Sequence, residues 1–537
     1  MTLSGKESVK NILGYLPYTA ELYWLVRHKD KPLQTQFNLK QLNAHLPQLV
    51  KEVQAIRQEG NIKGKKVFLF ATLHYWIEHA TLLGLSLAAM GHDVTVGFLP
   101  YANWQKEINR FDLRRQNLYA LEVLGKAAAV LEVKSLLNEH PRTDLEEEVL
   151  ACIEQVSMYD AQYTLQDEDV DRDNPVFKMR TARNEAAARA ALTWLSEGKP
   201  DAVIVPNGTI QELGIVYRMA RHLGIPATTY EFGDQRQTIW LAQNGEIMRQ
   251  ETDSMWAVRK QQPIDSGQLK RVQELFGARQ KGSVAENFTR LWQKSPAQGG
   301  QKVRQQLGLD ERPVVLLATN VLGDSLTLGR DLFTKSMASW IMRTVQYFNG
   351  RPDVQLVIRV HPGEVLTHGV SMVDVVHEVL PTLPEHIHLI PPDEKVNTYD
   401  LMEAASLGLV YTTTVGLEMA LNGLPVIVNA YTHYRGRGFT QDPNSWVEYF
   451  KLLGKILEKP QDYRLTEEQI TLAWQYAYYW FFDFPRPFPW HLVRVWDDYK
   501  ERSLREVFSA EGRQKFGTTF GYLTGECLDW SKIEPSK

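Results

Sequence analysis

Two separate series of alternating strand-like and helix-like segments constrain the fold of this 537-residue chain more than any other feature. The first series begins at Lys66 with the apolar run KVFLFAT, continues with a helix-spaced segment that ends at Gly91, and then reaches the strand-like run DVTVGFLP. A strand, a helix of more than a dozen residues and a second strand form a βαβ unit, whose two strands run parallel. The runs DAVIVP at 201–206 and ATTYEF at 227–232 continue the same predicted sheet.

The second series begins with PVVLLATN at 313–320 and continues with VQLVIRVHP, HIHLIPP, SLGLVYT and LPVIVNA. Two parallel sheets without a detectable repeat predict an α/β fold with two Rossmann-like domains that face each other across a cleft. In TIWLAQNGEIMRQ the pair Asn244-Gly245 lies between two alternating runs and predicts a hairpin.

The predicted domain boundaries follow from these two series. They are a helical extension at 1–62, a Rossmann-like domain with a helical insertion at 63–257, a polar linker at 258–312, a second Rossmann-like domain at 313–470, and aromatic-rich helices at 471–537 that cross back. The aromatic stretch LAWQYAYYWFFDFPRPFPWHLVRVW is expected to pack across the two domains, and a membrane-interface belt is the alternative.

Composition narrows the functional classes. A formal net charge of -4 argues against a dedicated nucleic-acid binder, which carries a strongly basic domain or stripe. The two cysteines, Cys152 and Cys527, lie far apart, so neither a disulfide framework nor a structural zinc site is expected. No run approaches the roughly 18 apolar residues that span a bilayer, and no signal peptide is recognised. A cytoplasmic protein is expected, with peripheral contact to the inner face of the membrane left open.

Polar residues gather where strands of the second series end, which is where open α/β sheets bind ligands. In LGLVYTTTVGLEMALNG, Thr413 and Thr414 lie between a strand and a helix, where hydroxyls and unpaired N–H groups favour phosphate. Glu418 follows about one turn into that helix and would reach a ribose hydroxyl. Plain helix capping with a solvated glutamate is the alternative.

Two further strand ends in this series carry polar side chains. In QLVIRVHPGE, Arg359, His361 and Glu364 follow a buried strand, and the Pro-Gly turn would hold the histidine so that it donates to a phosphate oxygen. A structural histidine in a surface turn is the alternative. The loop after the first strand contains Asp324 and Ser325, of which Ser325 would contact a second phosphate and Asp324 would equally serve as a helix N-cap.

In the first series, His74, Glu231 and Asp234 follow strand ends and could act as a general base or a nucleophile. For each one, a satisfied core histidine or a capping acid is the alternative. The chain contains no GxxxxGK[ST], HExxH or GxSxG motif and no convincing GxGxxG, so P-loop hydrolysis, zinc proteolysis, α/β-hydrolase chemistry and standard NAD binding lose support.

Taken in order, these segments resemble the capsule polysaccharide synthesis family, glycosyltransferases of GT-B architecture that include bacterial Kdo transferases. The motifs that carry the resemblance are Asn207-Gly208, Glu231-Phe232-Gly233 with TIWLAQNGEI, Gly323-Asp324-Ser325, Arg359 with His361-Pro362, Thr413-Thr414 with Gly416 and Glu418, and Tyr434 with GRGFT at 436–440. The chain departs from the family where Asp234-Gln235-Arg236-Gln237 replaces a proline-containing segment. The identities of donor and acceptor therefore stay open.

The resemblance implies a nucleotide-sugar donor held by the second domain, a glycan or lipid-linked acceptor held by the first, and catalysis with neither a cofactor nor a metal. The implied donor contacts are His361, Arg359, Ser325, Asp324, Thr413, Thr414 and Glu418 for the nucleotide, and Tyr434, Arg435 and Arg437 for the sugar. The implied catalyst is Glu231, Asp234 or His74. A CDP-polyol phosphotransferase, a sugar-nucleotide epimerase and a non-catalytic glycan-binding protein on the same frame are the alternatives.

Overall fold

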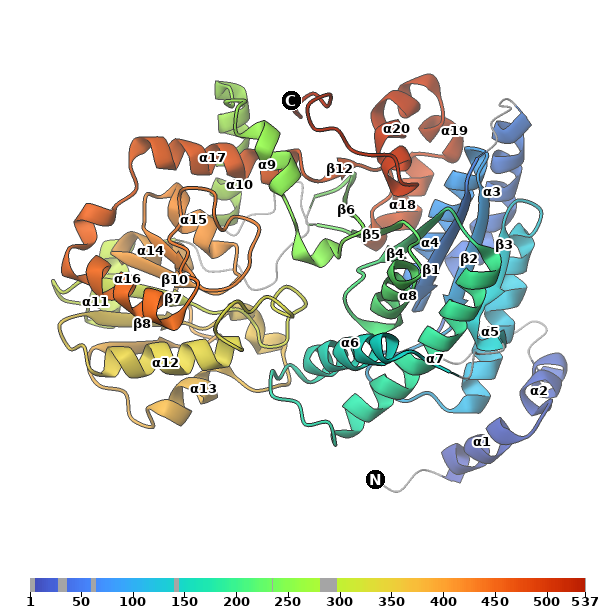
Figure 1. Ribbon diagram of the computed structural model, residues 1–537, viewed down its shortest axis with the longest axis horizontal. Coiled ribbons are helices and arrows are strands. Elements are labelled where there is room, and N and C mark those ends of the chain that lie inside the picture. The colour runs from blue at the N-terminus through green and yellow to red at the C-terminus, as the bar shows by residue number, and fades with distance from the viewer. Residues whose placement is uncertain are drawn as a thin grey trace. The chain divides into compact units, whose positions relative to one another are not determined.

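The computed structural model describes residues 5–27, 36–58, 64–139, 144–233, 235–280 and 297–536. The chain divides into two compact α/β units, and neither is continuous in sequence (Figure 1). Unit 1 contains Met1–Asp160, Arg172–Met248 and Arg486–Leu528, and unit 2 contains Ala161–Asp171, Arg249–Pro485 and Asp529–Lys537. The predicted linker at 258–312 is therefore placed differently, because its described helices belong to unit 2.

Unit 1 is built on a seven-stranded sheet in the order β12-β6-β5-β4-β1-β2-β3. Its strands are β1 Lys66–Thr72, β2 Asp93–Leu99, β3 Glu132–Ser135, β4 Ala202–Pro206, β5 Ala227–Glu231, β6 Thr238–Gln243 and β12 Arg486–Pro487. Its helices are α1 Gly5–Tyr15, α2 Thr19–Arg27, α3 Lys40–Gln58, α4 His74–Ala89, α5 Arg110–Leu124, α6 Glu147–Leu165, which ends in unit 2, α7 Pro175–Gly198, α8 Gln211–His222, α18 Val495–Glu501, α19 Leu504–Val507 and α20 Ala510–Leu523.

Five strands of this sheet, β3-β2-β1-β4-β5, are parallel, which confirms the predicted parallel sheet. The predicted hairpin at Asn244-Gly245 is wrong, since β6 pairs antiparallel with the preceding strand β5. Asn244 does turn the chain, with φ at 54°, but its side-chain oxygen accepts the N–H of Ala227 at 3.1 Å and ends β6 there. The residues Ile247–Arg249 then form a 3-10 turn instead of a returning strand.

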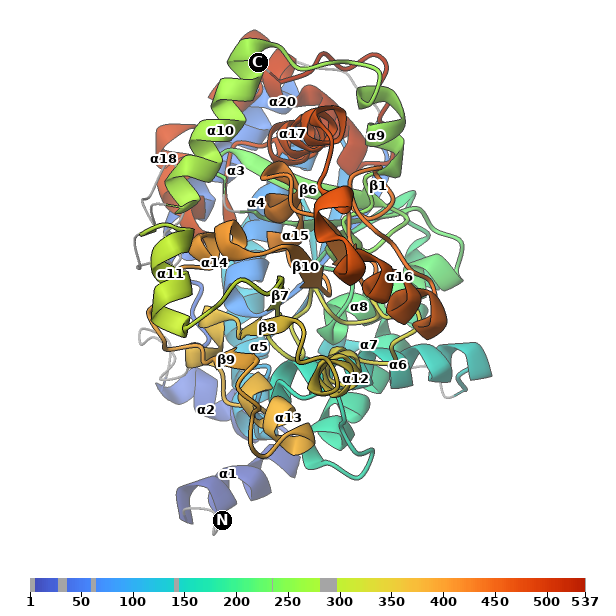
Figure 2. The same ribbon diagram turned by 90° about the vertical axis from the view of Figure 1, so that its left-hand side faces the viewer.

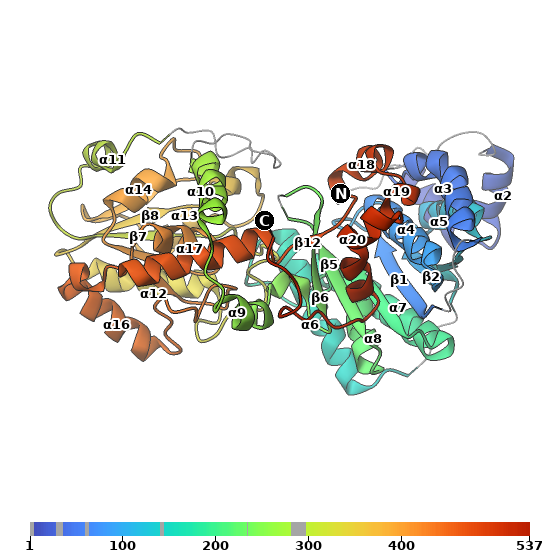
Figure 3. The same ribbon diagram turned by 90° about the horizontal axis from the view of Figure 1, so that it is seen from above.

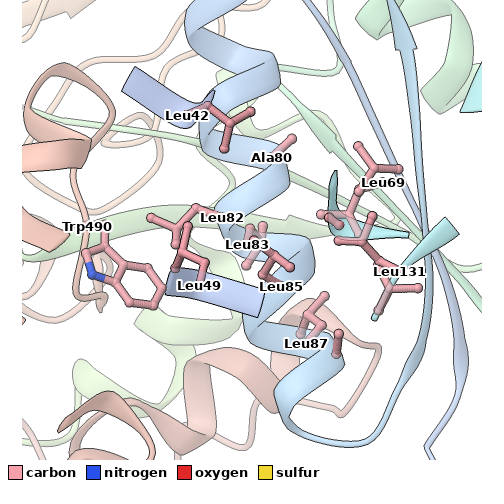
Figure 4. Close-up of a cluster of buried hydrophobic side chains, with 14 of the residues drawn as sticks. Leu42, Leu49, Leu69, Ala80, Leu82, Leu83, Leu85, Leu87, Leu131 and Trp490 are labelled. Atoms are coloured by element: carbon pink, nitrogen blue, oxygen red, sulfur yellow. The ribbon is translucent and has the colours of Figure 1, made fainter. Parts of the chain in front are cut away.

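Alternating side chains of the buried strands enter two different cores, as expected for a sheet that is covered on both faces. In β1, Val67 and Leu69 join the cluster formed with α3, α4 and the C-terminal helices, whereas Phe68 and Phe70 join the cluster formed with α7 and α8. Helix α4 is buried nearly all round because it lies between the sheet and α3, with Trp490 beside it (Figure 4).

The C-terminal helices return to unit 1, as predicted, and lie beside α3 and α4 (Figure 3). There Trp496 donates its indole N–H to Glu78 at 2.8 Å, and the backbone N–H of Leu504 donates to Glu52 at 3.1 Å. These bonds add to those that α3 itself makes to the two buried carboxylates, from Leu42 to Glu78 and from Gln48 to Glu52, so that both are satisfied.

The aromatic stretch is buried within the two units. Tyr476, Tyr478, Tyr479 and Trp480 of α17 and Trp490 of unit 1 are at most 4% exposed. The membrane-belt alternative is therefore wrong for these residues, because side chains without accessible surface cannot reach a lipid headgroup. No helix of the described ranges is long and apolar enough to cross a membrane.

Unit 2 is built on a five-stranded parallel sheet in the order β11-β10-β7-β8-β9. Its strands are β7 Val314–Ala318, β8 Gln355–Arg359, β9 Ile387–Ile390, β10 Leu407–Val410 and β11 Val426–Val428. Its helices are α9 Asp253–Arg259, α10 Ser266–Gln280, α11 Gly300–Leu307, α12 Met337–Asn349, α13 Met372–Val379, α14 Thr398–Ala404, α15 Val415–Leu421, α16 Trp446–Glu458 and α17 Glu467–Phe482. Helices α12 and α13 lie side by side (Figure 2) and, with α16, bury their apolar side chains against the strands.

Candidate functional site

The two sheets share one strand order, which locates a candidate site in each unit. In chain order, β3-β2-β1-β4-β5 and β9-β8-β7-β10-β11 are both the doubly wound order in which the first strand lies in the middle. Ligands of such sheets bind beyond the carboxyl ends of the strands where the order reverses, which is between β1 and β4 in unit 1 and between β7 and β10 in unit 2.

In unit 2, hydrogen bonds join the polar residues at this point. The strand register places Asn320, His361 and Thr412 side by side, two residues beyond β7, β8 and β10. The side-chain oxygen of Asn320 accepts the N–H of Thr412 at 3.2 Å, and the hydroxyl of Thr319 accepts the N–H of His361 at 3.0 Å. These bonds fix the three strand ends relative to one another.

His361 is half-buried at the start of the turn Pro362–Leu366. Its Nδ1 accepts the N–H of Gly363 at 3.0 Å. A ring nitrogen that accepts a hydrogen bond carries no proton, so the proton of the neutral ring lies on Nε2. His361 is therefore in the tautomer that can donate from Nε2 to an anion, and its phosphate contact stays a prediction.

The threonines and the glutamate of the opening turn of α15 are arranged differently from simple capping. Thr414 makes no capping hydrogen bond, and the hydroxyl of Thr413 accepts the N–H of Val415 at 3.4 Å. Glu418 is 3% exposed and its Oε1 lies 3.4 Å from Nε of Arg279 in α10. The solvated-glutamate alternative is wrong, because the carboxylate is buried and paired with a cation, and the ribose contact stays a prediction.

Asp324 organises the loop after β7. Its Oδ1 accepts the N–H of Leu326 at 2.8 Å, and burial raises the pKa of its carboxyl. Asp324 thus closes a turn, and the helix N-cap that was its alternative is wrong, because the next helix, α12, begins only at Met337. Its predicted nucleotide contact stays a prediction. Ser325 is half-buried in the same turn, and its phosphate contact stays a prediction.

Two residues assigned to the donor hold loops together instead. Arg359 is 4% exposed and donates to the carbonyls of Pro391 at 2.6 Å and Glu394 at 3.3 Å, and burial lowers the pKa of its guanidinium to about 10. Tyr434 has no exposed surface and donates its hydroxyl proton to the carbonyl of Thr413 at 2.6 Å. This corrects both predicted donor contacts, because neither side chain is accessible.

The two arginines that follow Tyr434 are also engaged within unit 2. Arg435 donates to the carbonyl of Pro443 at 2.6 Å and to the side chain of Asn444 at 3.0 Å. Arg437 donates to the carbonyl of His433 at 3.1 Å and forms an ion pair with Asp253. These bonds hold the loop, and both side chains are half-buried, so their contacts with the donor sugar stay predictions.

Gly416 provides a test of how tightly this region is packed. A Cβ added there would lie 2.3 Å from the Tyr434 hydroxyl and 2.8 Å from Cγ2 of Val410. Gly416→Ala is therefore expected to lower the free energy of unfolding by about 1–3 kcal/mol, measured by urea denaturation, because the hydroxyl must move. Gly454→Ala, in α16, is the matched control: an added Cβ would lie 3.7 Å from the Tyr347 hydroxyl of α12, and alanine should stabilise the helix. If the two substitutions changed the free energy of unfolding equally, the close packing around Gly416 would be contradicted.

In unit 1, Glu231 is the most strongly perturbed acid at a strand end. Its carboxylate ends β5 and accepts the N–H of Phe232 at 3.0 Å and the side-chain N–H of Asn207 at 3.4 Å. Burial raises the pKa of Glu231 to about 7. Near neutral pH both protonation states are populated, which is the property of a general acid or base.

Asn207 and Gly208 hold this acid in place from the end of the adjacent strand β4. Asn207 has φ at 59° and Gly208 has φ at 82°. A Cβ added to Gly208 would lie 2.4 Å from Cγ2 of Thr229 in β5, so only glycine permits this close approach. The turn thereby brings the amide of Asn207 to Glu231.

His74 begins α4, with β4 between its strand and that of Glu231. Its Nδ1 is buried, and no hydrogen-bond partner for it lies within the described ranges. Burial lowers the pKa of the His74 imidazole, so the ring is neutral at pH 7 and can accept a proton or a ligand donor. Asp234 lies outside the described residues.

Sequence reasoning missed the partners that come from far along the chain. Arg279 pairs with Glu418 across 139 sequence positions of unit 2, and His491 reaches the loop after Glu231. The ring of His491 donates from Nε2 to the carbonyl of Gly233 at 3.1 Å and lies 4.9 Å from the ring of Phe232. The local sequence around these residues does not predict either contact, because each forms only when a later segment folds back.

The fold and the two strand-end sites define a class: α/β proteins of two doubly wound units with polar and ionisable side chains at the carboxyl edges of their sheets. The chain matches no protein-family model and no curated protein. Three solved structures show what it is similar to. Thermosulfurimonas dismutans KpsC, a beta Kdo 2,4 transferase, is 16% identical over 54% of this chain and 82% of that chain, with a TM-score of 0.36. The UDP-GlcNAc 2-epimerase from Neisseria meningitidis is 14% identical over 76% of this chain and 94% of that chain, with a TM-score of 0.24. CalG4, the calicheamicin glycosyltransferase, is 13% identical over 82% of this chain and 98% of that chain, with a TM-score of 0.24. No reaction or substrate follows for this chain from similarities of this size.

Proposed function

We propose that the protein is a glycosyltransferase that moves a sugar from a nucleotide-sugar donor to a glycan or glycolipid hydroxyl in the assembly of a bacterial surface polysaccharide. The observation that carries the proposal is Glu231, a carboxyl with a pKa of about 7 at a strand end. An acceptor hydroxyl loses its proton during transfer, and a base with a pKa near the working pH suits that step. The substrate class follows from the resemblance of the sequence motifs.

In the proposed reaction, Glu231 takes the proton of the acceptor hydroxyl as the hydroxyl oxygen bonds to the anomeric carbon. The bond from that carbon to the phosphate oxygen of the nucleotide breaks, and the phosphate leaves with the electron pair. His361, held with Nε2 protonated, would donate to the phosphate oxygens where negative charge develops. His74 and Asp234 stay predictions as further groups on the acceptor side.

Nucleotide binding is the first test. A nucleotide that binds the folded protein stabilises it by about 2.7 kcal/mol at 100 times its dissociation constant. One of CMP, CDP, UDP and GDP is therefore expected to raise the unfolding temperature in a thermal-shift assay. His361→Ala is expected to weaken that nucleotide by about 10- to 100-fold in calorimetry, because it removes a hydrogen bond to a charged group.

His377→Ala is the matched control, since His377 lies near the end of α13, not at the carboxyl end of a strand. It should leave nucleotide affinity unchanged. If no nucleotide shifts the unfolding temperature, the proposal fails, and a non-catalytic glycan-binding protein is the alternative to test next. If a nucleotide does bind, mass spectrometry of the products separates transfer from epimerisation, which changes the donor sugar without an acceptor.

A further inference from the structure

Exposed apolar side chains concentrate on the two N-terminal helices, α1 and α2. Of the 17 exposed large hydrophobic residues in the described ranges, nine lie between positions 9 and 26. The central ones are Ile12, Leu22, Leu25 and Val26, flanked by Tyr15 and Tyr18, with exposed fractions from 60% to 80%. We refer to these six residues as the N-terminal apolar surface.

The two helices are fixed to unit 1 by their opposite faces, so the exposure is not that of a detached segment. They lie beside α5 (Figures 1 and 2). Gly14 packs so closely that an added Cβ would lie 2.7 Å from the backbone nitrogen of Phe111. Lys10 bonds to Asp112 at 2.7 Å, and Arg114 pairs with Glu21. The outward residues of α2 follow the i, i+3, i+4 spacing of one helical face.

Charge at this surface is positive, although the whole chain has a formal net charge of -4. The carboxylates of Asp112 and Glu21 are neutralised by their basic partners, and one further carboxylate, that of Glu122, accepts the indole N–H of Trp24 at 3.3 Å. Arg27 and Arg110 are exposed, and neither has an ion pair in the part of the chain that the structure describes. The guanidinium of Arg110 lies 5.5 Å from the ring centre of Tyr15, so one cation borders the apolar residues directly.

We propose that the N-terminal apolar surface binds the surface of an anionic lipid bilayer. Aliphatic side chains enter the acyl boundary, tyrosines sit at the headgroup level with their hydroxyls in water, and arginines meet lipid phosphates. A second copy of the chain fits less well. A stable dimer needs roughly 20–30 residues on each side, whereas this surface comprises a few side chains on helices of 11 and 9 residues.

Vesicle co-sedimentation of the full chain tests the proposal. Vesicles of phosphatidylcholine mixed equally with phosphatidylglycerol are expected to bind the protein at least about tenfold more tightly than phosphatidylcholine alone, and added salt should weaken that binding. The double substitution Leu25→Gln with Val26→Gln is expected to weaken binding to both vesicle types at least about tenfold. Arg27→Gln with Arg110→Gln should reduce only the preference for anionic vesicles.

Val447→Gln is the control, because Val447 is 78% exposed on α16 of unit 2 and should not affect binding. Thermal unfolding establishes that each variant is folded, and nucleotide affinity should be the same in all of them. The proposal is overturned if no vesicle binds, or if Leu25→Gln with Val26→Gln binds as the parent does. It is also overturned if light scattering shows a dimer that this double variant dissociates, without vesicle binding.

Discussion

Glu231→Gln is expected to lower kcat for sugar transfer by at least about 100-fold, since general base catalysis contributes roughly 10²–10⁴. The parent rate should rise with pH and level off above about 7, because the base must be ionised and the pKa of Glu231 is about 7. Glutamine keeps the shape of the side chain but cannot take a proton, so the variant should lose this rise. Initial rates from pH 5 to 9, with donor and acceptor saturating, measure both effects.

Stability distinguishes this role from a structural one. The folded-state pKa of Glu231 is raised above its ordinary 4.5, so the parent loses stability as pH rises from about 4.5 to about 7 and stays at the lower level above that. Glu231→Gln carries no such loss and should unfold at the same temperature as the parent or higher at pH 8. Glu185→Gln, on exposed α7 surface, is the control and should retain full activity. A variant that is both active and unstable would contradict the assignment.

Arg180→Met is expected to lower the free energy of unfolding by about 3–5 kcal/mol, the cost of leaving buried charges without their partner. The side chain of Arg180 has no exposed surface and lies 3.0 Å from Asp160 and 3.8 Å from Glu212, both buried. Arg183 pairs with Glu212 at 2.9 Å, so the network contains two cations and two anions. Methionine fills similar space but leaves two carboxylates with one cation.

Denaturant unfolding at several pH values measures this loss. The loss should shrink as pH falls, because protonation of the orphaned carboxylates removes their unpaired charge. Arg172→Met is the matched control: its pair with Glu154 is 75% and 50% exposed, and removing it should cost less than about 1 kcal/mol. A loss for Arg180→Met as small as that of the control would show that the buried network does not stabilise unit 1.

The strands could be predicted closely because their burial shows in the local sequence. KVFLFAT predicts a strand at 66–72, where β1 lies, and ATTYEF at 227–232 predicts β5 to within one residue. The Asn-Gly pair also predicts the turn at Asn244 correctly but not the strand that pairs there, since local turn chemistry does not say which strand pairs with which. Pairing is a contact between segments, and it is decided by the whole sheet.

Strand ends as sites of function could also be predicted, because parallel strands bring their carboxyl ends to one edge. Glu231, His361 and Thr413 do lie at such ends. The direction of each side chain could not be predicted. Arg359 and Tyr434 turn to carbonyls of neighbouring loops, and those loops take their positions only after distant segments have packed.

The sequence by itself determined that this chain forms two parallel α/β sheets with polar residues at their carboxyl edges, since apolar runs and turn residues act within a few positions. Only the tertiary structure decided which of these residues are accessible and which carry a perturbed pKa. Glu231 has a pKa of about 7 because its surroundings bury it, and among them His491 binds the carbonyl of Gly233 from the C-terminal return. Desolvation is set by everything packed around a group, and the residues that supply it here lie more than 200 positions apart in sequence.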